Sequence, residues 1–257
     1  ESAGLVKKWM VANELKMNDN KTEVMLITPK HMAGKIQCPS VVIGDCEINP
    51  TSQLGNLGVT MDSQVTMEKH VKKVCQSSYW HLYNISRIKH YLDRPALESV
   101  IHAFVTSKLD YGNSLLCGYP AVLINKLQRV QNAAARLLTG HSKFTHVTPI
   151  LRELHWLPVC QRIRFKIVSL VFKARHQLAP GYLQELIQPY TPTRSLRSTS
   201  QELLVVPHSK SASVTERAFS IAGPRLWNSL PLELRTIQKY PVFKKCLKTH
   251  LFQQYYG

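Results

Sequence analysis

The spacing of apolar residues predicts a mixed first part of the chain, with one helix and a few short strands. Apolar side chains recur near helical spacing over residues 3–16, and an Asn/Asp turn follows. The apolar run at 24–27 has the length of a buried strand, and further strands are expected at 41–43 and across 54–61. We therefore predict a small α/β segment over residues 1–66.

A helical pattern begins at Met67. The first helix is expected to turn one stripe toward a core, made of Val71, Val74, Ser78, Leu82, Ile85 and Ile88. Asp93 or Arg94 is suited to cap the next helix, with Pro95 at its first position. The predicted core stripe of that helix is Leu97, Val100, Ile101, Phe104, Val105 and Leu109.

A third helix is predicted from about 121 to 138, with Gly140 as the glycine that ends it. Its expected buried positions are Leu123, Leu127, Val130, Ala134 and Leu137. A short helix then opens at Thr148-Pro149, and Pro158 ends it and begins another. The apolar positions of that last helix are Ile163, Ile167, Leu170, Val171 and Ala174. Residues 67–188 therefore predict a helical bundle.

The remaining residues predict a linker and a small tail. Residues 189–200 are rich in Pro, Ser and Thr and hold one aliphatic side chain, so they predict a linker. Residues 201–257 predict a strand near 203–206, helical turns interrupted at Gly223-Pro224, and a final helix begun by Pro241. The predicted fold class is mainly α, with a small α/β N-terminal segment, a helical bundle and a small C-terminal α/β tail.

The charge is concentrated in the last two thirds of the 257 residues. Residues 1–70 carry 7 Lys/Arg and 8 Asp/Glu, residues 71–180 carry 16 and 4, and residues 181–257 carry 10 and 4. A basic excess of this kind is typical of nucleic-acid binding, although a solvated basic surface would look the same. Binding to a membrane is less favoured, because the longest uncharged run has 15 residues and contains Gly and Pro. The sequence shows no signal peptide and no membrane-spanning run.

Basic side chains that flank the apolar stripes of the helices are the candidate phosphate contacts. They are Lys72, Lys73, Lys126, Arg129, Arg136, Arg162, Lys166 and Lys173. The alternative is that these charges serve solubility alone.

Other chemistry is sparse. Aromatic residues that could stack on bases are Tyr79, Trp80, Tyr83, Tyr91 and Trp156, of which we expect most to lie in the core and Trp156 to anchor a helix junction. Six cysteines without a Cys-x-x-Cys pair indicate reduced thiols in an intracellular protein, and neither they nor the histidines have metal-ligand spacing. We expect no structural zinc and no metal site.

Several segments resemble, in the same order, the reverse transcriptases of LINE-type (non-LTR) retrotransposons. They are Leu15-Lys16-Met17-Asn18 with Lys21-Thr22-Glu23, then Asn56 to Asp62, His102 to Tyr111, Val130 to Arg136, Leu154 to Val159, and Pro224 to Pro231. The resemblance covers nearly the whole chain. Trp227, in the last segment, is expected to pack.

The resemblance implies the end of a polymerase palm with a primer-grip-like hairpin in 1–66, a thumb-like bundle in 67–188, and a C-terminal region. It implies an RNA-directed DNA polymerase that grips its template–primer duplex, with RNA and RNA–DNA hybrid as partners and the upstream palm and fingers of the same polyprotein attached. It also implies Mg²⁺ in the full-length enzyme and a location in nucleus and cytoplasm.

The Tyr/Phe-Ala-Asp-Asp sequence that holds the metal ions in that family does not occur in this chain. We therefore expect a fragment that begins after the catalytic aspartates, holds no cofactor itself and is inactive alone. Lys21 is the one catalytic candidate that the resemblance supports, as a proton donor to the leaving pyrophosphate. A surface lysine in a turn is the equal alternative.

Two other interpretations stay open. The chain could be a non-enzymatic helical protein, derived from a retroelement, that binds nucleic acid or another protein. It could also be an untranslated relic without a selected function.

Overall fold

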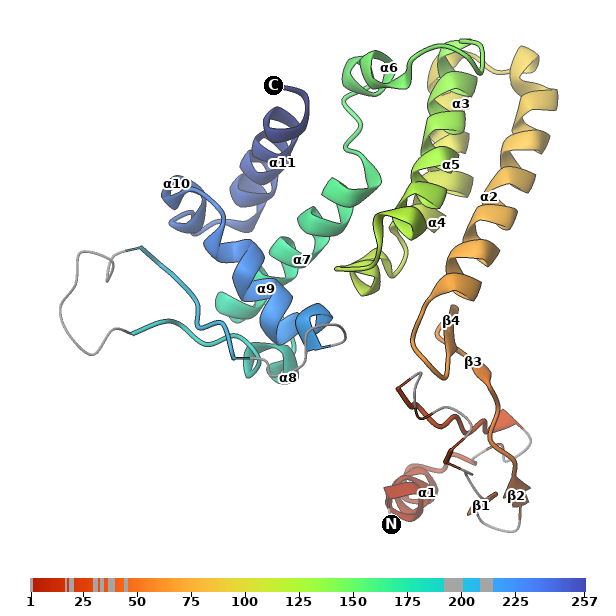
Figure 1. Cartoon of the computed structure of the whole chain (residues 1–257), viewed down its shortest axis with the longest axis vertical. Helices are drawn as coiled ribbons and strands as arrows, with labels where there is room; N and C mark the ends of the chain where they lie inside the picture. Colours follow the sequence, from red (N-terminus) through yellow and green to blue (C-terminus); the bar gives the residue numbers. More distant parts are fainter. Residues whose placement is uncertain are drawn as a thin grey trace. The chain divides into compact units, whose positions relative to one another are not determined.

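The structure is a computed structural model that describes residues 2–16, 18, 21–29, 32, 35–36, 40–43, 46–191, 201–208 and 215–257. The chain divides into two compact units, Glu1–Lys73 and Val74–Gly257. Most described residues are helical, and the strands lie near the N-terminus (Figure 1). This confirms the predicted fold class of a mainly α protein with a small α/β N-terminal segment.

The first unit holds helix α1 and two antiparallel hairpins. Its elements are α1 (Ser2–Ala12), β1 (Val41–Ile43), β2 (Cys46–Ile48), β3 (Gln53–Asn56) and β4 (Val59–Asp62). Leu57 and Gly58 join β3 to β4 with φ of 46° and 80°. Two successive positive φ values are characteristic of the hairpin turn whose twist matches its strands, and glycine adopts this conformation without strain.

The prediction of a strand at residues 24–27 is wrong, because these residues belong to no strand of the two described sheets. Single backbone hydrogen bonds hold this segment instead, from Thr51 N to Val24 O at 2.8 Å and from Thr28 N to Ser63 O at 3.0 Å. The strand predicted across 54–61 is a hairpin of two strands, since the turn at Gly58 reverses the chain.

Asp62, at the end of β4, organises the chain before α2 (Glu68–Ile88). Its carboxylate accepts hydrogen bonds from the backbone N–H groups of Gln64, Thr66 and Met67, at 3.2, 2.9 and 3.1 Å, and from the Thr66 hydroxyl at 2.9 Å. Burial works to raise the pKa of Asp62, but these donors outweigh it and hold the pKa below its ordinary value.

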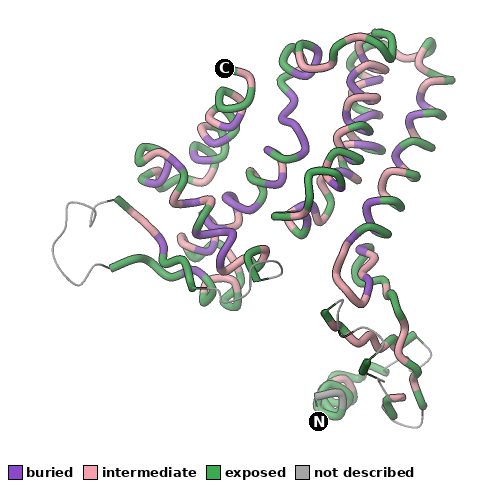
Figure 2. Tube along the Cα trace, viewed as in Figure 1, coloured by how far each residue is buried: buried purple, intermediate pink, exposed green. Residues whose placement is uncertain are grey.

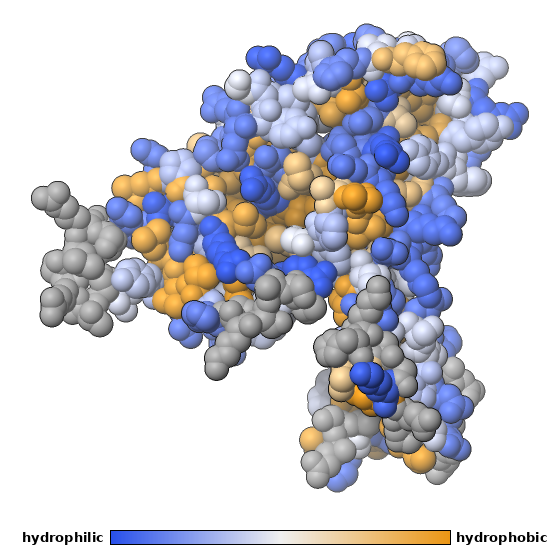
Figure 3. Space-filling model, in the orientation of Figure 1, coloured by the Kyte–Doolittle hydropathy of each residue, from blue (hydrophilic) through white to orange (hydrophobic). Residues whose placement is uncertain are grey.

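The second unit is helical. Beyond the later part of α2, its helices are α3 (Arg94–Ile101), α4 (Ser107–Asp110), α5 (Ala121–Thr139), α6 (Val147–Glu153), α7 (Val159–Arg175), α8 (Gly181–Gln184), α9 (Phe219–Asn228), α10 (Leu232–Arg235) and α11 (Tyr240–Tyr256), and its short 3-10 turns are η2 (Lys89–Tyr91), η4 (Asn113–Leu116) and η6 (Thr215–Arg217). Buried residues concentrate along α5 and α7 (Figure 2). Hydrophobic patches lie among hydrophilic residues on the face that Figure 3 displays.

The helix start at Asp93 follows the sequence closely. The Asp93 carboxylate accepts from Ala96 N at 2.8 Å and Pro95 lies in the first turn. α3 then continues through a π-helical segment, η3 (His102–Thr106), into α4. A π turn rotates each residue less around the axis, so Val105 stays fully buried while Phe104 is 48% exposed. The prediction of Phe104 as a core residue is therefore wrong.

Side chains of α5 form hydrogen bonds with the backbone at the junction between α6 and α7. Gly140 ends α5 in the left-handed conformation, as predicted, while Leu138 rather than Leu137 is buried. At the junction, Gln131 Nε2 donates to Leu157 O at 2.9 Å and Val159 N donates to Gln128 Oε1 at 2.8 Å. Two glutamines of α5 thus satisfy backbone groups where α7 begins.

The C-terminal helices pack on α7. Phe172 of α7 stacks on Phe243 of α11 with ring centroids 4.3 Å apart, and Trp227 of α9 lies 5.7 Å from Phe243. All three side chains are fully buried. α9 approaches α7 so closely that a Cβ on Gly223 would lie 2.9 Å from Val171 Cγ2. These contacts place the predicted C-terminal tail in the second unit.

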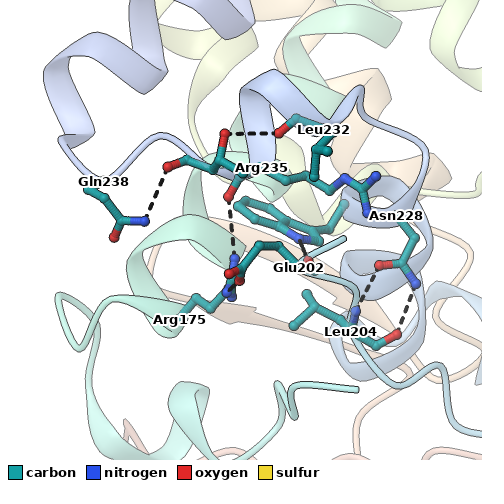
Figure 4. Close-up of polar contacts among 9 residues, drawn as sticks. Arg175, Glu202, Leu204, Asn228, Leu232, Arg235 and Gln238 are labelled. Carbon is teal, nitrogen blue, oxygen red and sulfur yellow. Dashed lines mark hydrogen bonds and ion pairs between the residues drawn. The ribbon is translucent and has the colours of Figure 1, made fainter. Parts of the chain in front are cut away.

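Two predictions for this tail are corrected. α9 runs through Gly223-Pro224 without interruption. The strand near 203–206 is only an isolated bridge between Leu204 and Pro189. Instead of a second strand, the Asn228 side chain pairs with Leu204, Trp227 Nε1 donates to Glu202 O at 2.9 Å, and Glu202 pairs with Arg175 (Figure 4). Residues 192–200 of the predicted linker lie outside the described residues.

Candidate nucleic-acid interface

The predicted phosphate contacts fall into an exposed set and a set with partners inside the protein. The exposed residues are Lys126 and Arg129 on α5 and Lys166 on α7, and also Lys72 and Lys73, which belong to the first unit. Arg136, Arg162 and Lys173 each have a partner within the second unit. Sequence spacing could not separate the two sets.

Arg136 fixes a loop. Its Nε and Nη2 donate to the backbone oxygen of Thr145 at 3.1 and 2.8 Å. Since Thr145 lies two residues before the start of α6, this fork ties the end of α5 to the next helix. The guanidinium therefore serves the fold.

Arg162 is also internal. Its Nη1 lies 2.6 Å from Asp110 Oδ2, its Nε donates to Leu157 O at 3.0 Å, and the side chain is only 17% exposed. The ion pair joins α7 to the end of α4 and neutralises the Arg162 charge. Lys173 is half-buried, with Nζ 4.8 Å from the centroid of the Tyr240 ring.

An open cleft of about 480 Å³ in the second unit is lined by several cations. Lys166 of α7 and Lys244 and Lys248 of α11 line it and are exposed. The wall also holds Leu154, His155, Trp156, Leu157, Phe165, Asn113 and the Arg162–Asp110 and Glu98–His102 pairs. Because Asp110 neutralises Arg162, Lys166, Lys244 and Lys248 supply the remaining positive charge, and we call this site the lysine cleft.

Lys244 and Lys248 were not among the predicted contacts. They lie one turn apart on α11, which places both on one side of the helix. The cationic run Lys244, Lys245 and Lys248 was the available signal. Only the packing of α11 on α7 brings two of these residues next to Lys166.

A second basic edge lies on α5. Lys126 and Arg129 are exposed, and their charges act on Cys75 and Tyr79 of α2. Burial raises the pKa of the Cys75 thiol, against the opposing charge of Lys126. Burial likewise raises the pKa of the Tyr79 phenol, against the opposing charge of Arg129.

The aromatic candidates are more exposed than predicted. Tyr79, Trp80, Tyr83 and Tyr91 are 44%, 62%, 61% and 88% exposed, so the expectation that most lie in the core is wrong. Trp156 is buried, and its backbone oxygen accepts from the Tyr256 hydroxyl at 2.9 Å. Trp156 therefore anchors the helix junction, as expected, and offers no face to a base.

Lys21 lies exposed in the first unit, in a short turn whose backbone bond runs from Lys21 N to Asn18 O at 3.1 Å. Among the residues that the structure describes, no three His, Cys, Asp or Glu side chains are grouped to hold a metal ion. None of the described helices is long and apolar enough to cross a membrane.

Comparisons with protein-family models, with curated proteins and with solved structures find no match to this chain.

Proposed function

We propose that the chain is the nucleic-acid-binding C-terminal part of a LINE-type RNA-directed DNA polymerase, and that its second unit grips the template–primer duplex. The observation that carries this proposal is the lysine cleft, where Lys166, Lys244 and Lys248 surround one hollow while Arg162 beside them is paired with Asp110.

Lysine side chains are suited to this task. An exposed ammonium contacts phosphate oxygens as a mobile point charge and releases counterions, which gives affinity without reading sequence. A polymerase thumb needs such contacts, because the duplex must slide while it is held. Lys126 on α5 supplies a further exposed cation for the same RNA–DNA hybrid.

The segments that resemble the retrotransposon family have structural roles in the second unit. Asp110 holds Arg162 across two helices, and Trp227 lies in the aromatic core. These residues maintain the fold of a thumb-like region. Such residues fit the proposal, because the fold of a thumb does not depend on which nucleic-acid sequence the polymerase copies.

The first unit suits attachment to the upstream palm and fingers of the same polyprotein. α1 exposes Leu5, Val6 and Trp9 on one side, each more than half exposed, and such an apolar face favours a covering partner. In the full-length enzyme Mg²⁺ would assist nucleotidyl transfer. The described residues do not fit a two-metal site, so no step of the proposal runs through a metal ion. The proposed location is nucleus and cytoplasm.

The test is the salt dependence of binding to a labelled RNA–DNA hybrid. Lys166→Gln, Lys244→Gln and Lys248→Gln combined should flatten the slope of log affinity against log salt by about 0.9 per lost contact, so by up to roughly 2.7. The matched control replaces Lys143, Lys239 and Lys245, which are exposed in the same unit but do not line the cleft.

Equal slopes for the two triple variants would remove the lysine cleft from the interface. A folded wild-type chain without measurable hybrid binding would overturn the proposal and favour a non-enzymatic protein-binding role.

A further inference from the structure

The part of α2 in the second unit turns aromatic side chains to solvent. Tyr79, Trp80 and Tyr83 are 44%, 62% and 61% exposed. At 3.6 residues per turn they lie within roughly 100° of the helix circumference. The opposite side of the helix is buried through Ser78, Leu82 and Ile85. The exposed rings therefore form a surface of their own, on the side of α2 that faces away from the core.

Aromatic contacts extend this surface to the π-helical segment. The His81 ring meets Trp80 edge-on with centroids 4.8 Å apart, and it stacks on Phe104 at 5.2 Å. Phe104 is itself 48% exposed. We define the aromatic surface as Tyr79, Trp80, Tyr83 and Phe104.

Cations border the aromatic surface on several sides. The Arg87 guanidinium lies 6.0 Å from the centroid of the Tyr83 ring. The Arg129 charge acts on Tyr79, and the Lys108 charge, after burial, lowers the pKa of His81. Residues 74–92 and 121–139 contain no Asp or Glu. α2 from residue 74 onward and α5 therefore carry cations without carboxylates, and the exposed rings of α2 offer flat apolar faces between these charges.

We propose that the aromatic surface binds single-stranded nucleic acid, with unpaired bases stacking on Tyr79, Trp80 and Tyr83 and phosphates meeting Arg87, Lys108 and Arg129. Paired bases cover one another's faces within a duplex, whereas unpaired bases are free to stack on aromatic rings. The inference deepens the proposed function, because a polymerase part that holds a hybrid also meets unpaired template. It uses a surface separate from the lysine cleft.

The test compares a labelled oligothymidylate with an abasic oligonucleotide of equal length, using fluorescence anisotropy. The wild-type chain should prefer the strand with bases. Trp80→Ala and Tyr83→Ala should each weaken oligothymidylate binding roughly tenfold and leave abasic binding unchanged. Trp80→Phe should retain most of the affinity. Tyr182→Ala, at an aromatic residue of α8 that is 67% exposed, is the matched control and should bind as wild type.

Equal affinity for the two strands, or wild-type binding by the alanine variants, would overturn the inference. So would a change from dimer to monomer in Trp80→Ala, because the surface would then join two copies of the chain. Circular dichroism melting confirms that each variant is folded. Hybrid binding without oligothymidylate binding would reject this inference and leave the lysine cleft standing. Oligothymidylate binding without hybrid binding would overturn the proposed duplex grip and leave the present inference standing.

Discussion

The side-chain amide of Asn228 makes both backbone hydrogen bonds of Leu204. Asn228 Nδ2 donates to Leu204 O at 2.9 Å, and Leu204 N donates to Asn228 Oδ1 at 2.9 Å. A β-strand partner would supply the same two groups, so a residue at the end of α9 takes the place of a neighbouring strand (Figure 4). Leu204 is only 2% exposed, and water cannot readily replace this partner.

Asn228→Ala should therefore lower the free energy of unfolding by roughly 1–3 kcal/mol, because it leaves a buried backbone donor and acceptor unsatisfied. Urea unfolding measures the change. Ser229→Ala, at an exposed neighbour, should change it by at most about 0.5 kcal/mol. A loss no larger than that of the control would show that Leu204 finds another partner.

The aromatic core of the second unit gives a larger expected effect. Phe243→Ala should lower the free energy of unfolding by roughly 3–5 kcal/mol, because it opens a cavity against Phe172 and Trp227. Val242→Ala on the same helix is the control, since Val242 is 48% exposed. The measurement is again urea unfolding, and similar losses in both variants would contradict the packing described for α11.

Substitutions of Arg162 and Lys166 should affect different properties, stability and binding, although the two residues lie only one helical turn apart on α7. Arg162→Gln breaks the pair with Asp110 and should lower the free energy of unfolding by roughly 1–3 kcal/mol, with little effect on the salt dependence of hybrid binding. Lys166→Gln should flatten the salt dependence of hybrid binding and leave the free energy of unfolding nearly unchanged. Hybrid titrations across salt, paired with urea unfolding, measure both quantities. An Arg162→Gln variant of unchanged stability that flattens the salt slope would return Arg162 to the interface.

Local sequence signals predicted much of the bundle. The Asp93 cap, the glycine that ends α5 and the buried stripe of that helix depend on neighbours within a few residues. Phe104 was wrongly predicted to be buried, because a π turn changes the helical period that the pattern assumes.

The candidate site was predicted less well, because long-range packing decides it. The spacing of Arg162 in the sequence is that of an exposed cation. Its side chain is internal because it pairs with Asp110 of another helix. Lys244 and Lys248 become part of a site only when α11 packs on α7. The side chain that holds Leu204 likewise comes from a residue of α9 that is distant in sequence.

Asp62 should make the first unit sensitive to acid. Its pKa in the folded state lies below the ordinary value, so its carboxylate stabilises the fold above the unfolded-state pKa of about 3.9. That contribution is lost as the pH falls through the lower folded-state pKa. Asp62→Asn removes the titration and should lower the melting temperature at neutral pH, with a smaller further decrease in acid than wild type. Thermal melts over a pH series measure this, with Glu68→Gln, at a nearby exposed carboxylate, as control. Parallel pH profiles for wild type and Asp62→Asn would show that the Asp62 carboxylate does not couple proton binding to folding.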